Sequence, residues 1–167
     1  MSIQLFITGG TIDKTYNPLT GELGFDTSQS QLPKMLKQAR CSANTIECQQ
    51  LFLIDSLDMQ QQHRDVILKH CQESKHEHIL ISHGTDTMAE TATFLAQHIS
   101  NKTIVLFGAM IPYALKDSDA LFNLGTAIAA VQQSETGCYI TMNGSVFDAL
   151  KARKNRLQGV FEISEEE

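Results

Sequence analysis

Short apolar runs alternate with stretches of helical periodicity, and this alternation constrains the fold more than any other feature of the chain. The expected strands are residues 3–8, 45–54, 78–82, 103–107 and 138–142. The expected helices are residues 28–40, 59–74, a segment ending near residue 99, and 119–131. Such alternation produces parallel strands joined by right-handed crossovers. The predicted fold class is therefore α/β, with a doubly wound, mainly parallel sheet and helices on both faces.

The apolar patterns also predict which segments are buried. Residues 78–82 (HILIS) are apolar throughout, so we expect a central strand there. The helix that follows has an apolar stripe with spacings of four, three and four: Met88, Ala92, Leu95 and Ile99. In the helix expected at 59–74, the inward candidates are Val66, Ile67 and His70. Residues 13–26 are polar and contain glycines, and we expect a long loop of the kind that often covers a site.

Candidate site residues follow the expected strands directly. Thr11, Ser56, the Thr85-Asp86 pair and the Ala109-Met110 pair each come just after a strand. In parallel α/β sheets, ligands bind outside the carboxyl ends of the strands. We therefore expect these residues to gather at one edge of the sheet, in a site built from separate loops.

The residue types at this edge suggest nucleophilic chemistry. Thr11 leaves its strand through Gly9-Gly10, and Thr85 offers a second hydroxyl. A threonine hydroxyl is a weak nucleophile until a base or a nearby charge activates it. Downstream, one of Lys151, Arg153 or Lys154 is a candidate to reach Thr85 as a cation. Thr87 and Glu90 have the spacing of a capping box, whose helix start would favour an anion.

Each of these features also has a structural interpretation. Gly9-Gly10 can be a simple turn, and Thr85, Asp86 and Thr87 can be helix caps. Ser56 can be a turn residue, and His83 a hydrogen-bonded packing residue. The basic run at 151–156 can be a hydrated surface. The functional hypothesis depends on several of these features meeting at one edge.

Composition excludes several classes of partner. The net charge is −6 and basic residues do not cluster, which argues against nucleic acid or an anionic membrane. Apolar runs stay well short of the ~20 residues that span a bilayer, and the start does not resemble a signal peptide. The four cysteines are scattered, as expected for buried reduced thiols in a cytoplasmic protein. His76 and His78 flank Glu77 without a metal-site motif, so we expect a solvated strand edge and no metal.

Two motifs in order resemble a known family. TGGTI (residues 8–12) and HGTDTM-x-ET (83–91) are similar to the paired signatures of bacterial-type L-asparaginases and glutaminase-asparaginases. GAM-x-P (108–112), Asp119 and FNL (122–124) extend the similarity through most of the chain. The resemblance implies the family's amino-terminal α/β domain. It also implies hydrolysis of the side-chain amide of L-asparagine to L-aspartate and ammonia, without metal or cofactor.

The resemblance also implies roles for individual residues. Thr11 matches the nucleophile that forms an acyl-enzyme, and Thr85 and Asp86 match a relay completed by a lysine. That lysine is Lys154, or Lys151 if the register slips. The substrate-binding residues would be Ser56, Gly84, Ala109 and Asp86, with Asp86 also binding the α-amino group.

The chain departs from the family pattern in three places. Leu57 stands where the family has a glutamine that contacts substrate, which predicts weak affinity for asparagine and little glutaminase activity. Tyr16 is the candidate for the family's loop tyrosine, in a shorter loop. The chain ends at Glu167, so we expect a single amino-terminal-type domain over 1–167 without the carboxyl-terminal domain. A homo-oligomer, dimer or tetramer, is expected from the family.

Three functions are therefore considered. The first is an amidohydrolase acting through a threonine acyl-enzyme. The second is a catalytically impaired domain of the same fold that binds an amino acid or amide. The third is a nucleotide-binding domain using Gly9-Gly10 as a phosphate turn, and it is the weakest because G-x-G-x-x-G is missing. A pure binding domain has no use for a lysine near Thr85, so the enzyme is favoured.

Overall fold

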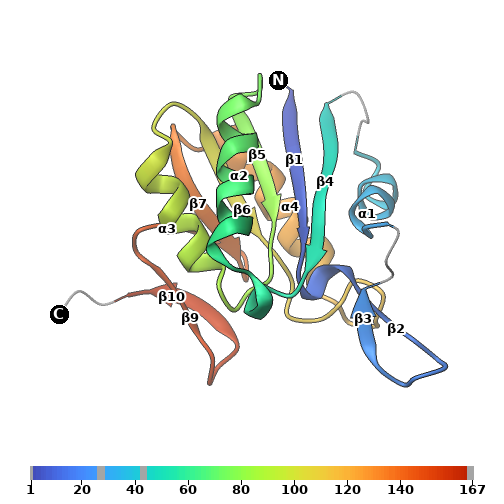
Figure 1. Ribbon diagram of the computed structural model, residues 1–167. Helices are drawn as coiled ribbons and strands as arrows, with labels where there is room; N and C mark the ends of the chain where they lie inside the picture. Colours follow the sequence, from blue (N-terminus) through green and yellow to red (C-terminus); the bar gives the residue numbers. More distant parts are fainter. Residues whose placement is uncertain (1, 26–28, 42–44, 165–167) are drawn as a thin grey trace.

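A six-stranded sheet forms the centre of the molecule, in the order β4-β1-β5-β6-β7-β8. The computed structural model describes residues 2–25, 29–41 and 45–164 (Figure 1). The strands are β1 (Ile3–Gly9), β4 (Ile46–Ile54), β5 (His78–Ser82), β6 (Thr103–Phe107), β7 (Gly137–Met142) and β8 (Ser145–Asp148). Neighbours from β4 to β7 are parallel, and β8 is antiparallel to β7. The predicted doubly wound, mainly parallel sheet is confirmed, with β5 inside it.

Helices cover both faces of the sheet, because successive strand residues point to opposite sides. Leu5 and Ile7 pack with α1 (Leu32–Gln38) and α4 (Ala120–Gln133). Phe6, between them, packs with α2 (Gln61–Glu73) and α3 (Met88–His98). Figure 1 shows α2 and α3 in front of the sheet and α4 behind it. This alternation is the period-2 pattern of a strand buried on both sides.

Most helix predictions hold, with corrections to one inward residue of α2 and to the length of the first helix. All members of the predicted α3 stripe are at most 7% exposed. In α2, Ile67 is buried but Val66 is 41% exposed, so Val66 is not an inward residue. The first helix is shorter than predicted, and the predicted start at residue 28 lies outside the described residues. Its observed start is held by Asp13, whose Oδ1 accepts hydrogen bonds from Ser30 Oγ and Gln31 N.

The long loop predicted at 13–26 is wrong, because the chain forms a hairpin there. Strands β2 (Lys14–Tyr16) and β3 (Leu23–Phe25) pair antiparallel. The turn is closed by Gly21 N donating to Asn17 O, with Gly21 at a positive φ of 75°. A second hairpin, β9 (Ala152–Asn155) and β10 (Val160–Ile163), follows β8. Both hairpins lie at the edge of the body where β1 and β4 end (Figure 1).

None of the helices in the described part of the chain is long and apolar enough to cross a membrane.

Candidate active site

The double glycine at the end of β1 is required by two close backbone contacts. A Cβ on Gly9 would lie 2.5 Å from Ile54 N, and one on Gly10 would lie 2.4 Å from Gly84 N. Both glycines have positive φ, 94° and 85°, which side chains of L-residues rarely adopt. The loops after β1, β4 and β5 therefore meet at one point. Thr11, which opens a short 3-10 helix (Thr11–Asp13), directly follows this contact.

Ser56 lies on the other side of Gly84. A Cβ on Gly84 would lie 2.5 Å from Ser56 Oγ. Ser56 is only 1% exposed, and none of the described residues hydrogen-bonds its hydroxyl. A buried hydroxyl without a protein partner is costly unless water or a ligand bonds it. This hydroxyl is therefore a candidate ligand contact.

The predicted capping box at the start of α3 does not form. Thr87 is the N-cap residue, but its side chain makes no capping bond. Instead, Thr87 Oγ1 donates to Ser56 O at 2.8 Å, which ties the β4 and β5 loops together. Glu90 forms an ion pair with Arg64 at 2.9 Å. Thr87 and Glu90 have the sequence spacing of a capping box, but each side chain bonds a tertiary partner instead.

The loop after β6 lies against Thr85. A Cβ on Gly108 would lie 2.4 Å from His83 O and 3.4 Å from Thr85 Cγ2. Asp119 holds this loop, because Oδ1 of its carboxylate accepts from Met110 N and Ile111 N, each at 3.0 Å. Ala109, between these contacts, is 1% exposed. Its backbone is thereby fixed beside the Thr85 loop.

Lys154 reaches this edge from β9. Its Nζ donates to Thr85 Oγ1 at 2.7 Å and to Asp86 Oδ1 at 3.0 Å. The lysine side chain is 15% exposed, and Thr85 is 4% exposed. Lys151, the other register, is exposed and lies in the turn before β9, where its carbonyl accepts from Ser164. Of the two lysines, the structure brings Lys154 to the predicted threonine and aspartate.

A second ion pair borders the cluster and was not foreseen from the sequence. Lys14 Nζ, from β2, lies 2.5 Å from Asp55 Oδ2, and Asp55 Oδ1 accepts from Leu57 N. Burial alone would raise the pKa of Asp55. The bonds from Lys14 and Leu57 and the charges of Lys14 and Lys154 outweigh it, so the pKa is lowered. Asp55 is therefore an ionised neighbour of Ser56.

His83 is a buried, hydrogen-bonded residue, as its structural interpretation predicted. Its Nδ1 lies 2.7 Å from Gly84 O, so this nitrogen carries the proton. Nε2 then accepts from Thr91 Oγ1 at 2.9 Å, and Arg64 Nε donates to the same hydroxyl. Burial, with the charge of Arg64, lowers the pKa of His83 to about 4 against the opposing bond to Gly84. A neutral His83 thus orients the carbonyl next to Thr85.

Two residues taken from the family pattern lie further out. Tyr16 is 56% exposed on the projecting β2–β3 hairpin, and the structure does not bring it into the Lys154 cluster. Leu57 is 65% exposed beside Ser56 and offers no side-chain hydrogen bond there. Within the described residues, neither side chain hydrogen-bonds the loops described above, although the Leu57 backbone N–H donates to Asp55.

Two predictions away from this edge need correction: a solvated His76 and four buried cysteines. His76 is not solvated: it is buried, with Nε2 at 3.2 Å from Glu47 Oε2. Across the residues that the structure describes, no group of three or more His, Cys, Asp or Glu side chains could hold a metal ion. All four cysteines are free, but only Cys71 and Cys138 are buried, and Cys48 is exposed.

Fold and site together define a class of protein. It is a doubly wound α/β domain in which Lys154, from the β9–β10 hairpin, contacts Thr85 and Asp86 at the carboxyl ends of the parallel strands. Ligands bind at this edge in such folds. The chain belongs to the asparaginase family, whose model described as "Asparaginase, N-terminal" matches residues 2–164.

Individual relatives also have asparaginase names. The chain is 32% identical to a Haemophilus influenzae protein named "Probable L-asparaginase periplasmic", over 95% of this chain and 48% of that protein. The L-asparaginase structure from Thermococcus kodakarensis matches with a TM-score of 0.84 at 26% identity, over 98% of this chain and 51% of that one. A "Probable Cytoplasmic L-asparaginase" structure from Campylobacter jejuni matches with a TM-score of 0.75 at 31% identity, over 93% and 50%. The chain thus spans about half the length of the relatives it matches, and their names differ in cell compartment.

Proposed function

We propose that this chain is an L-asparaginase-type amidohydrolase that converts L-asparagine to L-aspartate and ammonia. The names of its relatives support this activity. The observation that carries the proposal is the bond from Lys154 Nζ to Thr85 Oγ1, at 2.7 Å in a largely buried setting. A lysine amine held against a threonine hydroxyl at the ligand edge suits acid–base catalysis.

In the proposed reaction, Thr11 is the nucleophile. Its hydroxyl oxygen attacks the carbon of the side-chain amide and its proton passes to the departing nitrogen. The C–N bond breaks, ammonia leaves, and an ester to Thr11 remains. Water then attacks the ester carbon, the C–O bond breaks, and Thr11 regains its proton as aspartate is released. Each step conserves electrons, so no redox partner is needed.

Thr85, Lys154 and Asp86 form the proposed proton relay. Lys154 accepts the proton of the attacking hydroxyl through Thr85 and returns it to the departing nitrogen. Asp86 Oδ1, 3.0 Å from Lys154 Nζ, holds the amine in place beside Thr85. This arrangement provides a base and an acid at one atom without a histidine.

The substrate is proposed to lie among Ser56, Gly84, Ala109 and Asp86. The Ser56 hydroxyl, buried and unbonded by any described residue, would hydrogen-bond the substrate. Asp86 would bind the α-amino group, since its side chain is 32% exposed toward solvent. Leu57 supplies no polar contact, so weak affinity for asparagine and little glutaminase activity remain predictions. The homo-oligomer also remains a prediction, which sedimentation equilibrium would test.

Ammonia release from L-asparagine, L-glutamine and small amides by the purified chain tests the proposal. Thr11→Ala should reduce kcat by at least about a thousandfold, since it removes the nucleophile. Thr126→Ala, on helix α4, is the control and should leave the rate within about twofold, because the Thr126 hydroxyl donates to Phe122 O within the same helix. Unchanged turnover by Thr11→Ala would contradict the mechanism. Absence of ammonia from every amide would contradict the activity itself.

A further inference from the structure

A two-residue turn joins β7 to β8. Met142 and Ser145 pair across it, and Asn143 and Gly144 form its tip. Both tip residues have positive φ, 56° and 79°. A type I′ hairpin turn requires positive φ at both central positions, and Asn-Gly is its favoured sequence. The turn accounts for the backbone of Asn143, but it does not employ the side-chain oxygen.

The side chain of Asn143 is used in a contact outside the turn. Its Oδ1 accepts a hydrogen bond from Phe161 N of β10 at 3.1 Å. The backbone N–H of Asn143 donates to Oδ1 of Asn123 at 3.2 Å, and Asn123 is completely buried. Asn123 Nδ2 in turn donates to Gly108 O at 3.0 Å, in the loop that lies against Thr85. Two asparagines therefore connect the Thr85 region to the β9–β10 hairpin.

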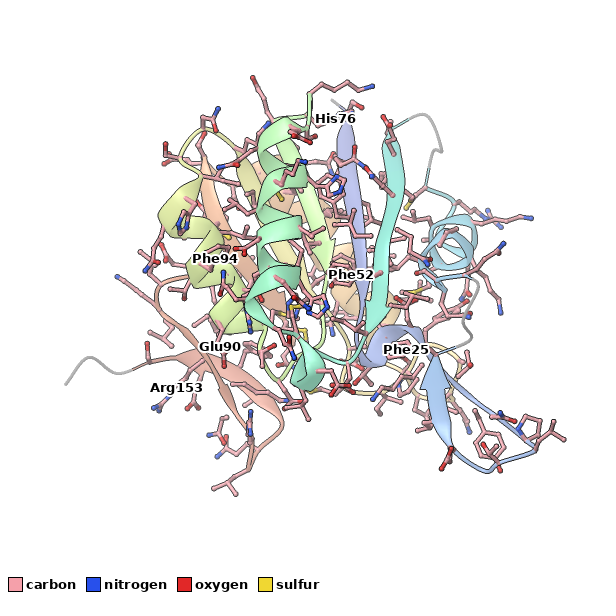
Figure 2. All side chains as sticks on the ribbon, in the orientation of Figure 1. Phe25, Phe52, His76, Glu90, Phe94 and Arg153 are labelled. Atoms are coloured by element: carbon pink, nitrogen blue, oxygen red, sulfur yellow. The ribbon has the colours of Figure 1, made fainter. Side chains whose placement is uncertain are left out.

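Phe161 is the residue directly opposite Lys154 in that hairpin. Residues opposite one another in an antiparallel pair place their side chains on the same face. Phe161 is buried in the core, with its ring 6.5 Å from that of Phe147. Arg153 is on the other face of β9, where it bonds Glu162, and Figure 2 shows it near the outer side of the hairpin. The face of β9 that carries Lys154 is therefore the one held against the body of the molecule.

These contacts form a ring that begins and ends at Thr85. On one side, Lys154 Nζ donates to Thr85 Oγ1 at 2.7 Å. On the other side, a Cβ on Gly108 would lie 3.4 Å from Thr85 Cγ2. The asparagines join the two sides through β10. Strands β9 and β10 pair only with each other, so the bond from Asn143 is a direct link between this ribbon and the β7–β8 turn of the central sheet.

We propose that Asn143 is a positioning residue that holds Lys154 at bonding distance from Thr85. The inference rests on the proposed function, in which Lys154 and Thr85 relay the proton. Asn143 acts through Phe161, because its oxygen fixes the backbone of β10 at the position opposite Lys154. A displacement of about 1 Å in a catalytic group can cost about a hundredfold in rate. Loss of this bond should therefore lower kcat without weakening substrate binding.

The turn itself allows a clean substitution. Asn143→Gly keeps the positive φ that the turn requires and removes only the side-chain acceptor. It should lower kcat for L-asparagine about tenfold and leave KM within about twofold, since positioning is lost and the substrate contacts are kept. Asn143→Asp also suits the turn and keeps an acceptor oxygen, so its kcat should stay within about threefold of the wild type. The control is Asn101→Gly, an exposed position before β6 at the opposite edge of the sheet, which should change neither constant.

A double-mutant cycle separates positioning of Lys154 from a general effect on the fold. In a protein that already carries Lys154→Met, adding Asn143→Gly should change kcat by less than about twofold, because the group that it positions is gone. An equal tenfold loss in both backgrounds would overturn the inference. So would an unchanged kcat in Asn143→Gly alone, or an Asn143→Asp variant as slow as Asn143→Gly.

Chemical labelling tests the inference without turnover, so its failure and the failure of the proposed function can be told apart. The Lys154 side chain is 15% exposed and bonds two acceptors, whereas Lys151 is exposed. Acetic anhydride should therefore label Lys154 more slowly than Lys151, as measured by mass spectrometry. Asn143→Gly should raise the ratio of Lys154 to Lys151 labelling about threefold or more, the effect of one lost hydrogen bond, and Asn143→Asp should not. An unchanged ratio in Asn143→Gly would overturn the inference, whether or not the chain hydrolyses any amide.

Discussion

Gly10 lies against the backbone of Gly84 so closely that a Cβ on Gly10 would be 2.4 Å from Gly84 N. The contact joins the two loops that carry Thr11 and Thr85. The first prediction concerns this contact. Gly10→Ala should lower the free energy of unfolding by roughly 2–4 kcal/mol, from strain at positive φ plus the clash with backbone. Urea denaturation measures it.

Gly21 offers a matched control for that substitution. It also has positive φ, 75°, but a Cβ there would meet nothing within 4 Å. Gly21→Ala should therefore cost only the conformational part, about 1 kcal/mol. Equal losses for the two variants would show that the approach of Gly10 to Gly84 does not matter.

The second prediction concerns the lysine. Lys154→Met keeps most of the side-chain volume but removes the ammonium that bonds Thr85 and Asp86. It should lower kcat for L-asparagine by about a hundredfold or more, the range of lost acid–base catalysis. Lys151→Met, in the exposed turn three residues earlier, should leave kcat within about twofold. The reverse ranking would move the catalytic role to Lys151.

The third prediction is a pH dependence from His83. Its pKa in the folded protein is about 4, below its usual 6.5. Above pH 6.5 the ring is neutral in both states and contributes no pH dependence. Between pH 6.5 and 4 the unfolded chain binds a proton that the folded chain refuses, so stability falls by up to about 3 kcal/mol.

His83→Gln should flatten that part of the stability profile, because carboxyl groups titrate alike in both proteins. Urea denaturation at half-unit pH steps measures the difference. NMR titration of the wild type gives a second reading that needs no variant. Protonation of the His83 ring near pH 6.5 in the folded protein would refute the assignment.

The fourth prediction concerns Lys14 and Asp55. Lys14→Met removes the main partner of Asp55, so the pKa of Asp55 should rise. A lowered carboxyl pKa stabilises the fold above the unfolded pKa, and this stability is lost as pH falls through the folded pKa. The variant should be less stable at pH 7 by up to about 1 kcal/mol, because the pair is partly exposed, and equally stable near pH 2. Lys116→Met, an exposed lysine with no ion pair among the described residues, should show no such difference.

Apolar patterning predicted the central strands well because β1, β5 and β6 are buried on both faces. The predicted strand at 103–107 coincides with β6, and the α3 stripe is buried as expected. Local sequence patterns gave wrong predictions where tertiary contacts compete with the local structure. Thr87 bonds Ser56 O in place of a cap. Residues 14–25 form a hairpin whose short, half-exposed strands carry too weak an apolar pattern to predict.

Candidate site residues could be predicted where they directly follow a strand. Side-chain contacts between segments far apart in the sequence could not. Thr11, Ser56 and Thr85 follow their strands directly, so topology alone placed them at one edge. Lys14 with Asp55, and Arg64 with Thr91, join segments 41 and 27 residues apart. No sequence spacing predicts such pairs, since the geometry of the folded loops selects them.

The β9–β10 hairpin has a consequence for how the molecule tolerates heat. Its strands pair only with each other, separate from the six-stranded sheet. A lone two-stranded ribbon is marginally stable in water, but Phe161 of β10 is 5% exposed and packs into the core beside Phe147. The ribbon that carries Lys154 is therefore anchored by the same core as the central sheet. On warming, turnover should be lost together with the core and not before it.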